Sequence, residues 1–417
     1  MTDLLNFDNS IGTARDNRSK PVHDWYRFTA GFSYKLVDKI IKGEELAKGD
    51  TIYECFAGCG TTLVSAQNQG IKAIGNEGQE LLFDVIRAKL NWNVDKNKIL
   101  NELENIKTNL RTNQKYDYHK LMISLYSEKD LSQLYSIKEQ VFSISELDIM
   151  LFLKLALTQT LHKSSIHPIS VPYISRNKTI RKDLSAFEIF EKIVFKMLDD
   201  IDKIKIVKQS SKIYLHDSRT KNENIFDNSC TISITSPPYL NNLDYGEVSK
   251  VCSHFFGLTN SWNDITEKVR KKLVTGATTH FKNKEFNIDN YKNTEFYYLN
   301  SSIVEPLFSL TEKIRLESYK RVGKKRFDIL VLYYFEDMFK VLKEMRRIIS
   351  ANGKAYLVLG DSAPYGIFID TTKVLGEIAL SVGFKKYKII KLRERGTKWK
   401  LRFRHNLKLS ENLLILE

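Results

Sequence analysis

The stretch Asp50–Thr62, DTIYECFAGCGTT, predicts a short strand, a glycine turn and the start of a helix. Glycines at positions 58 and 60 let the backbone approach a ligand at points where any side chain would collide with it. The turn has neither the third glycine of the dinucleotide fingerprint nor the Gly-Lys-Thr of a phosphate-binding loop. We therefore expect a ligand other than a pyrophosphate or a triphosphate.

A second strand, KAIGNE at 72–77, ends in the carboxylate of Glu77, which follows Gly60 by 17 residues. In a doubly wound sheet this carboxylate lies beside the first turn, where it can accept both hydroxyls of a ribose. The glycine turn alone is equally well explained as an ordinary tight turn. The combination with Glu77 favours a ligand site.

A third stretch, TISITSPPYLNN at 231–242, predicts a strand that leads into a rigid turn. Two prolines fix φ and remove two backbone donors, so the carbonyls of Ser236 and Pro237 can point outward. With the ring of Tyr239 after Pro238, they form a site for the exocyclic amino group of a flipped nucleobase. The alternative is an ordinary proline turn, but the whole chain has only seven prolines, which makes that placement less expected.

The turn FAGCGTT and the motif TSPPY together resemble the S-adenosylmethionine-dependent amino-methyltransferases of DNA, the N4-cytosine and N6-adenine type of bacterial restriction-modification systems. The resemblance implies S-adenosylmethionine as the cofactor and duplex DNA as the substrate. It also implies that the catalytic motif is Ser236, Pro237, Pro238 and Tyr239.

The same resemblance implies a set of cofactor-binding positions. Glu77 would hold the ribose, and Asp217 at a later strand end would meet the amino group of the adenine. Phe32 and Ser33 resemble the segment that closes over the methionine end, although a helix N-cap beside a core aromatic explains them equally well. The remaining positions would line the methionine and adenosine portions and are Glu54, Phe56, Gly58, Gly60 and Thr61.

The expected fold is α/β, a doubly wound and mostly parallel Rossmann-like methyltransferase sheet with helical and basic insertions. Residues 1–90 would hold the N-terminal segment and the cofactor-binding part, and 91–205 a mainly helical insertion, since that stretch is too long for a loop. Residues 206–257 would carry the TSPPY motif, 258–328 a basic insertion that is the candidate for target recognition, and 329–417 the C-terminal half of the catalytic domain.

The net charge predicts a polyanionic partner. The chain has 65 Lys and Arg residues and 50 Asp and Glu residues, which gives a formal net charge of +15. Between residues 385 and 408 eleven basic residues accompany one acidic residue. A solvated face is the alternative explanation of such a run. The candidate nucleic-acid-binding residues are Lys268, Arg270, Lys271, Lys272, Arg393, Arg395, Arg402 and Arg404.

We expect methyl transfer to the N4 amino group of cytosine, with base flipping. Carbon methylation would need a Pro-Cys nucleophile, and no proline here precedes a cysteine. Ser236 stands where many adenine-modifying relatives have aspartate, which favours cytosine. Two alternatives stay open: an N6-adenine enzyme acting on DNA or RNA, and a nucleic-acid-binding protein that has lost catalysis.

The remaining expectations concern the setting of the protein. No apolar run approaches a membrane span and the first residues are no signal peptide, which predicts a cytoplasmic protein. Four cysteines suggest reduced thiols. Cys55 and Cys59 have no second pair at zinc spacing, so no metal is expected. A cognate restriction endonuclease, encoded separately, is an expected partner.

Overall fold

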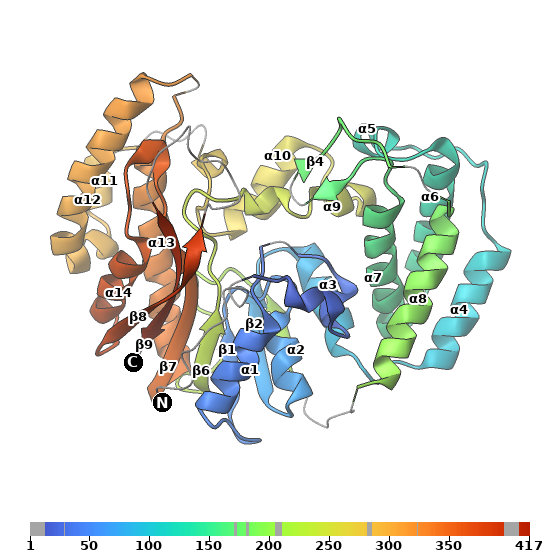
Figure 1. Cartoon of the computed structure of the whole chain (residues 1–417), viewed down its shortest axis with the longest axis horizontal. Coiled ribbons are helices and arrows are strands. Elements are labelled where there is room, and N and C mark those ends of the chain that lie inside the picture. Colours follow the sequence, from blue (N-terminus) through green and yellow to red (C-terminus); the bar gives the residue numbers. More distant parts are fainter. Residues whose placement is uncertain are drawn as a thin grey trace.

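The computed structural model describes residues 13–28, 30–170, 173–180, 183–204, 211–281, 286–322, 324–395 and 408–417. Its centre is a seven-stranded sheet (Figure 1). The strands are β1 (Thr51–Glu54), β2 (Lys72–Glu77), β5 (Lys212–Leu215), β6 (Cys230–Thr235), β7 (Ile349–Gly360), β8 (Tyr387–Arg395) and β9 (Leu409–Leu416). A separate pair of short strands, β3 (Ile169–Ser170) and β4 (Tyr173–Ile174), is antiparallel.

The strand order is β5-β2-β1-β6-β7-β9-β8. Neighbours from β5 to β7 are parallel, whereas β9 lies antiparallel between β7 and β8. This is the order of a doubly wound sheet with one antiparallel strand inserted near an edge, so the predicted α/β fold is confirmed. The chain direction across the sheet reverses between β1 and β6. Ligands bind at the carboxyl ends of the strands at such a switch point.

Alternation along the strands divides the sheet into two faces. In β7, Ala355, Leu357 and Leu359 enter the core beneath α12 (Glu295–Tyr319), α13 (Phe327–Ile348) and α14 (Thr371–Ser381). Tyr356 and Val358 enter the opposite core, beneath α1 (Tyr34–Gly43) and α2 (Thr61–Asn68). Both faces are therefore covered, as a mostly parallel sheet requires.

Residues 91–205 supply helices that form a bundle of their own beside the sheet (Figure 1). With α3 (Glu80–Leu90) and α9 (Lys250–Phe256) they share a third hydrophobic core. Ser185 begins the last of these helices with a capping box, since its side chain and that of Glu188 satisfy each other's backbone N–H groups. The bundle helices are α4 (Lys96–Thr108), α5 (Lys120–Ile123), α6 (Glu128–Ser143), α7 (Leu147–Ser164) and α8 (Ala186–Asp202).

In the described part of residues 258–328, α10 (Trp262–Asp264) lies beside α9, whereas α11 (Ile288–Lys292) and α12 lie on the side of the sheet away from the helical bundle (Figure 1). The segment before α11 closes over the turn that follows β2. A Cβ on Gly78 would lie 2.9 Å from the carbonyl oxygen of Lys272, so the two backbones touch. None of the helices in the described ranges has the length and apolarity that a bilayer crossing requires.

Candidate active site

The turn after β1 depends on its two glycines. Gly58 has φ of 56° and Gly60 has φ of 84°, a region that strains other residues. Gly60 then serves as the N-cap of α2. A Cβ on Gly58 would also lie 3.1 Å from the ring of Phe28. The turn can therefore pass under that ring only without a side chain.

Glu77 lies directly beside this turn, because β1 and β2 are adjacent and parallel. The backbone N–H of Gly58 donates to its Oε2 at 2.8 Å and that of Gln79 to its Oε1 at 2.9 Å. The side chain is buried, and this burial raises the pKa of Glu77 to about 7 against the opposing effect of the two donors. Each carboxylate oxygen keeps a further lone pair for a ligand hydroxyl.

Glu54 also carries a buried carboxyl, but it lies beneath the turn. Its Oε1 accepts from the backbone N–H of Phe56 at 3.0 Å, and its Oε2 from the Thr62 hydroxyl at 2.7 Å. Burial raises the pKa of Glu54 to about 8. The geometry gives this carboxyl a bracing role for the turn.

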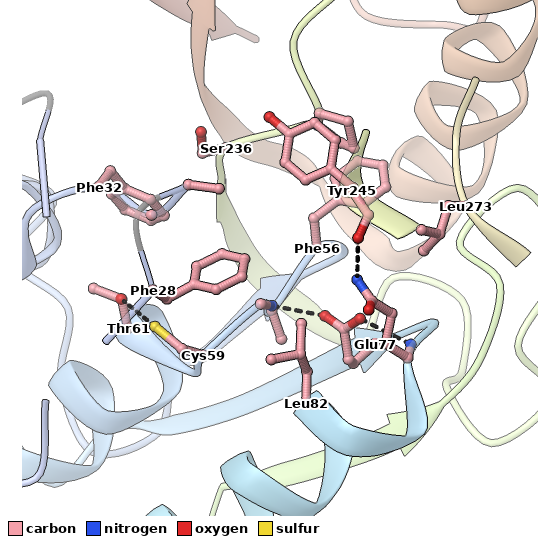
Figure 2. Close-up of a pocket in the computed structure, with 16 residues that line it drawn as sticks. Phe28, Phe32, Phe56, Cys59, Thr61, Glu77, Leu82, Ser236, Tyr245 and Leu273 are labelled. Carbon is pink, nitrogen blue, oxygen red and sulfur yellow. Dashed lines mark hydrogen bonds between the residues drawn. The ribbon is translucent and has the colours of Figure 1, made fainter. Parts of the chain in front are cut away.

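A cavity opens above the turn and brings the two sequence motifs together (Figure 2). Glu77 lines one side of it, and Ser236 and Pro238 line another. The other predicted cofactor residues in its walls are Phe32, Phe56, Gly58 and Thr61. Phe28 also lines it, from the segment 23–28 that resembles the family's closing segment, whereas sequence reasoning missed Gln79, Leu82, Tyr245 and Leu273. The rest of the lining is Ala30, Gly31, Ala57 and Cys59. Of the predicted residues that the structure describes, Ser33, Glu54, Gly60, Asp217, Pro237 and Tyr239 are not in the walls.

This cavity has a free volume of about 60 Å³, and Phe28 is one of the residues that line it. Phe28 and Cys59 also line a neighbouring cavity of about 410 Å³, so the ring is a partition between the two. Small-molecule pockets commonly measure roughly 300–1,000 Å³. The first cavity is therefore smaller than a typical nucleoside site, and the larger cavity lies next to it.

The N-terminal segment is attached to the turn by hydrogen bonds. The Asn17 amide donates to the carbonyl of Phe32 at 3.0 Å and to the Thr61 hydroxyl at 3.4 Å. Ser33 is the N-cap of α1 and its Oγ accepts from the backbone N–H of Lys35 at 3.2 Å. For Ser33 the helix-cap alternative is therefore observed, whereas Phe32 both packs in the core and reaches the cavity.

Asp217 follows β5, the neighbour of β2, but its carboxylate binds Arg219. The Arg219 Nη2 lies 2.6 Å from Oδ2 of Asp217, and the same guanidinium contacts Asp337 at 3.2 Å. Arg219 also donates to the carbonyl of Lys271 in the basic insertion at 2.5 Å. In this structure Asp217 anchors that insertion and does not reach the cavity.

The proline motif begins where β6 ends. The Ser236 hydroxyl donates to the carbonyl of Val358 on β7 at 3.3 Å. The Tyr239 ring is only 9% exposed, and burial raises the pKa of its hydroxyl well above the usual value. Its backbone N–H donates at 3.2 Å to the hydroxyl of Tyr245, and Tyr245 is part of the cavity wall (Figure 2).

We compared the sequence of the chain with those of known proteins. It is similar to Type II methyltransferases. Type II methyltransferase M.AvaI of Nostoc sp. is 26% identical over 407 residues, which cover 90% of this chain and 82% of the relative, and M.AvaI of Anabaena variabilis matches equally. M.BsoBI of Geobacillus stearothermophilus is 23% identical over 445 residues, covering 93% of this chain and 84% of the relative. No family model matches the chain.

The similarity to these relatives extends over both insertions. In the basic insertion, one of the basic side chains forms an ion pair within the protein. Arg270 is 2% exposed and its guanidinium binds the carboxylate of Asp244 at 2.7 Å. The indole of Trp262 lies against the same guanidinium, with the ring centroid 4.2 Å from its central carbon. A phosphate contact by Arg270 would require this buried pair to break, so its observed role is structural.

The other candidate cations differ in their surroundings. Lys271 pairs with Glu267 on the surface, and Lys272 is exposed. Arg393 on β8 binds Glu411, and Arg395 lies over the Tyr239 ring at 5.1 Å. Lys268 is exposed and its ammonium lies 3.4 Å from the carbonyl of Leu258, while Arg402 and Arg404 lie outside the described residues.

Proposed function

We propose that this chain is a site-specific DNA methyltransferase that transfers a methyl group from S-adenosylmethionine to an exocyclic amino group, the N4 of cytosine. One observation carries the proposal. The glycine turn with its carboxylate and the Ser-Pro-Pro motif come from distant parts of the sequence, yet they line the same cavity. The similarity to Type II methyltransferases along most of the chain supports the same conclusion.

The cavity residues suit this cofactor. Glu77 can accept the two ribose hydroxyls, and its surroundings allow the carboxylate to ionise near neutral pH. The aromatic faces of Phe28, Phe56 and Tyr245 suit a flat adenine and a positively charged sulfur. S-adenosylmethionine, when bound, supplies an electrophilic methyl group for an in-line displacement.

The residues of the motif orient the acceptor and form no covalent bond with it. The carbonyl oxygens of Ser236 and Pro237 accept the two hydrogens of the amino group, which turns the nitrogen lone pair toward the cavity. The nitrogen would gain the methyl group as the bond between that methyl and the cofactor sulfur breaks, S-adenosylhomocysteine would leave, and the nitrogen would release one proton to water. Positioning and electrostatics thus account for catalysis. The flipped base stacks on Tyr239 after the groups that cover this ring have moved.

Cytosine is proposed over adenine because Ser236 offers a neutral hydroxyl where a carboxylate would add a charged acceptor. This hydroxyl is already bound to the carbonyl of Val358. The backbone carbonyls therefore take the main accepting role. We also propose a separately encoded restriction endonuclease, whose cleavage of host DNA this methylation would block.

The test is transfer of a tritiated methyl group to duplex DNA, single-stranded DNA and transfer RNA, followed by digestion and chromatography of the nucleosides. Label in N4-methylcytosine of duplex DNA is the expected result. Label in N6-methyladenine would replace the cytosine assignment, and label in RNA would replace the substrate. DNA binding without transfer, when the cofactor binds normally, would indicate a binding protein. Sequencing methylated sites in host DNA would then give the recognition sequence.

A further inference from the structure

Tyr239 is attached to the last strand of the sheet through a buried carboxylate. Its hydroxyl donates to Oε1 of Glu411 on β9 at 2.8 Å. Glu411 is 3% exposed and is reached by no step of the proposed reaction. A charged acceptor gives a shorter and stronger hydrogen bond than a neutral one, so this contact fixes the far end of the ring.

Glu411 is itself held in place from the next strand. It pairs in register with Gly360 on β7 and with Arg393 on β8, so the three residues form one row across the sheet. The Arg393 Nε donates to Oε2 of Glu411 at 2.5 Å. Both carboxylate oxygens therefore have a partner, which a buried ionised group requires.

The same row also supports the ring from below. A Cβ on Gly360 would collide with Nη1 of Arg395 and would lie 2.9 Å from Cδ2 and 3.0 Å from Cε2 of Tyr239. The ring therefore rests directly on the backbone of β7. Because Gly360 has no side chain, the Tyr239 ring can occupy the space above it. The carboxylate of Glu411, which is paired with Gly360, accepts the hydrogen bond from the ring's hydroxyl.

We propose that Glu411 is a positioning residue for Tyr239, holding the ring in the orientation on which the target base stacks. The inference rests on the proposed function, because that function makes the Tyr239 ring the surface on which the target base stacks. Arg395 lies over the same ring through weaker attachments, hydrogen bonds of 3.3 Å to the carbonyl of Asp361 and the side chain of Asn242. The base can displace that guanidinium while the hydroxyl stays bound to Glu411.

A double-mutant cycle tests this role. Glu411→Gln should lower kcat for methylation of duplex DNA about tenfold, with little change in cofactor affinity, because the barrier rises at a step after cofactor binding. Tyr239→Phe removes only the hydroxyl and should lower kcat by a similar factor. In the Tyr239→Phe background, Glu411→Gln should have little further effect. Glu394→Gln is the matched control, since this exposed carboxylate of β8 pairs with Lys391 and does not touch the ring.

A fall in kcat from Glu411→Gln that is equally large in both backgrounds would overturn the proposal and leave Glu411 a partner of Arg393 alone. If Glu411→Gln does not fold, an unchanged kcat in Tyr239→Phe overturns it as well. Fluorine NMR of the fluorotyrosine-labelled protein tests the contact without activity. The resonance that Tyr239→Phe removes should shift in Glu411→Gln and stay in place in Glu394→Gln. A shift without methyl transfer by the wild type would leave the contact intact and refute the proposed function instead.

Discussion

Replacing Glu77 by glutamine should weaken cofactor binding through the loss of a charged acceptor. Two ribose hydroxyls that donate to a carboxylate contribute more than the same bonds to a neutral amide. Taking a loss of about 2–4 kcal/mol for the pair, we expect the Kd for S-adenosylmethionine to rise roughly 30- to 700-fold. Glutamine also offers only one oxygen to the N–H groups of Gly58 and Gln79, which both donate to Glu77 now.

The same carboxyl should make cofactor affinity depend on pH. Burial raises the pKa of Glu77 from 4.5 to about 7, a change that corresponds to about 3 kcal/mol against ionisation in the free protein. Below that pKa the carboxyl must lose its proton before it can accept two hydroxyls. Affinity should therefore rise with pH, by at most about tenfold per unit, and level off above about pH 7. In Glu77→Gln this dependence should disappear.

Stability should change in the opposite direction. Between 4.5 and about 7 the folded protein keeps a proton on Glu77 that the unfolded chain has released. The contribution of this group to the free energy of unfolding is therefore complete at low pH and is lost as the pH rises through the folded pKa. In Glu77→Gln, the free energy of unfolding should no longer fall with rising pH through this group.

Isothermal titration calorimetry at about pH 6 and about pH 8 measures the binding effect, and thermal unfolding in the same buffers measures the stability effect. Glu54→Gln is the control, because it changes a buried carboxyl that lies outside the cavity, so the pH dependence of binding below neutrality should persist. Unchanged cofactor affinity in Glu77→Gln, or the same pH slope as the wild type, would refute the role of Glu77.

Three further predictions follow from the site and the basic segments. Tyr239→Ala should remove base stacking of about 1–3 kcal/mol and lower turnover, whereas calorimetry should show nearly unchanged cofactor affinity; an equal loss of both would place the ring in the cofactor site. Arg270→Gln should lower the free energy of unfolding in urea by about 3 kcal/mol, because the half-buried carboxylate of Asp244 loses its guanidinium partner and keeps only neutral donors such as the Thr279 hydroxyl, and a change within error would mean that the pair is dispensable. Replacing Arg402 and Arg404 by alanine should weaken binding to every duplex and flatten the salt slope by roughly one or two units, with the methylated sequence unchanged. Filter binding over a salt series checks this, and an unaltered slope would assign the DNA path to other residues.

The fold and the meeting of Glu77 with the glycine turn could be predicted from local patterns. Each of the features used can be recognised in a short stretch of sequence. These features are alternating apolar strands, a turn that needs glycines, and a carboxylate at the end of a strand. The doubly wound fold then brings adjacent parallel strands together by a general rule. The sequence distance between Gly58 and Glu77 is short, so little else had to be known.

The role of charged side chains could not be predicted in the same way. Arg270 and Asp217 stand in sequence contexts that suit DNA and adenine, but each binds an oppositely charged side chain. Asp217 binds Arg219, two residues along the chain, and folding brings Asp337 to the same guanidinium. Asp244 reaches Arg270 across 26 residues, and Glu411 reaches Tyr239 across 172. A charge run predicts the net charge of a segment and leaves open which of its members are buried in pairs.

The cavity wall was missed for a related reason. Leu273 belongs to a stretch that composition marks as basic, and Tyr245 follows the catalytic motif with no pattern of its own. Both reach the cavity because the loop after the motif and the start of the basic insertion contact the turn after β2. In the sequence, the only sign that such a residue lines the cavity is that it is apolar and close to a predicted motif. Many residues that do not line the cavity have the same two properties.

The position of β9 has a consequence for synthesis of the protein. This strand lies inside the sheet, between β7 and β8, although residues 409–416 are the last of all its strands to be translated. A nascent chain can already contain the glycine turn, the Ser-Pro-Pro motif and Tyr239. Until β9 leaves the ribosome, however, β8 has no neighbour among the described strands and the tyrosine has no carboxylate to bind. The ring of Tyr239 would therefore gain the contact that we propose for it only after β9 has been synthesised.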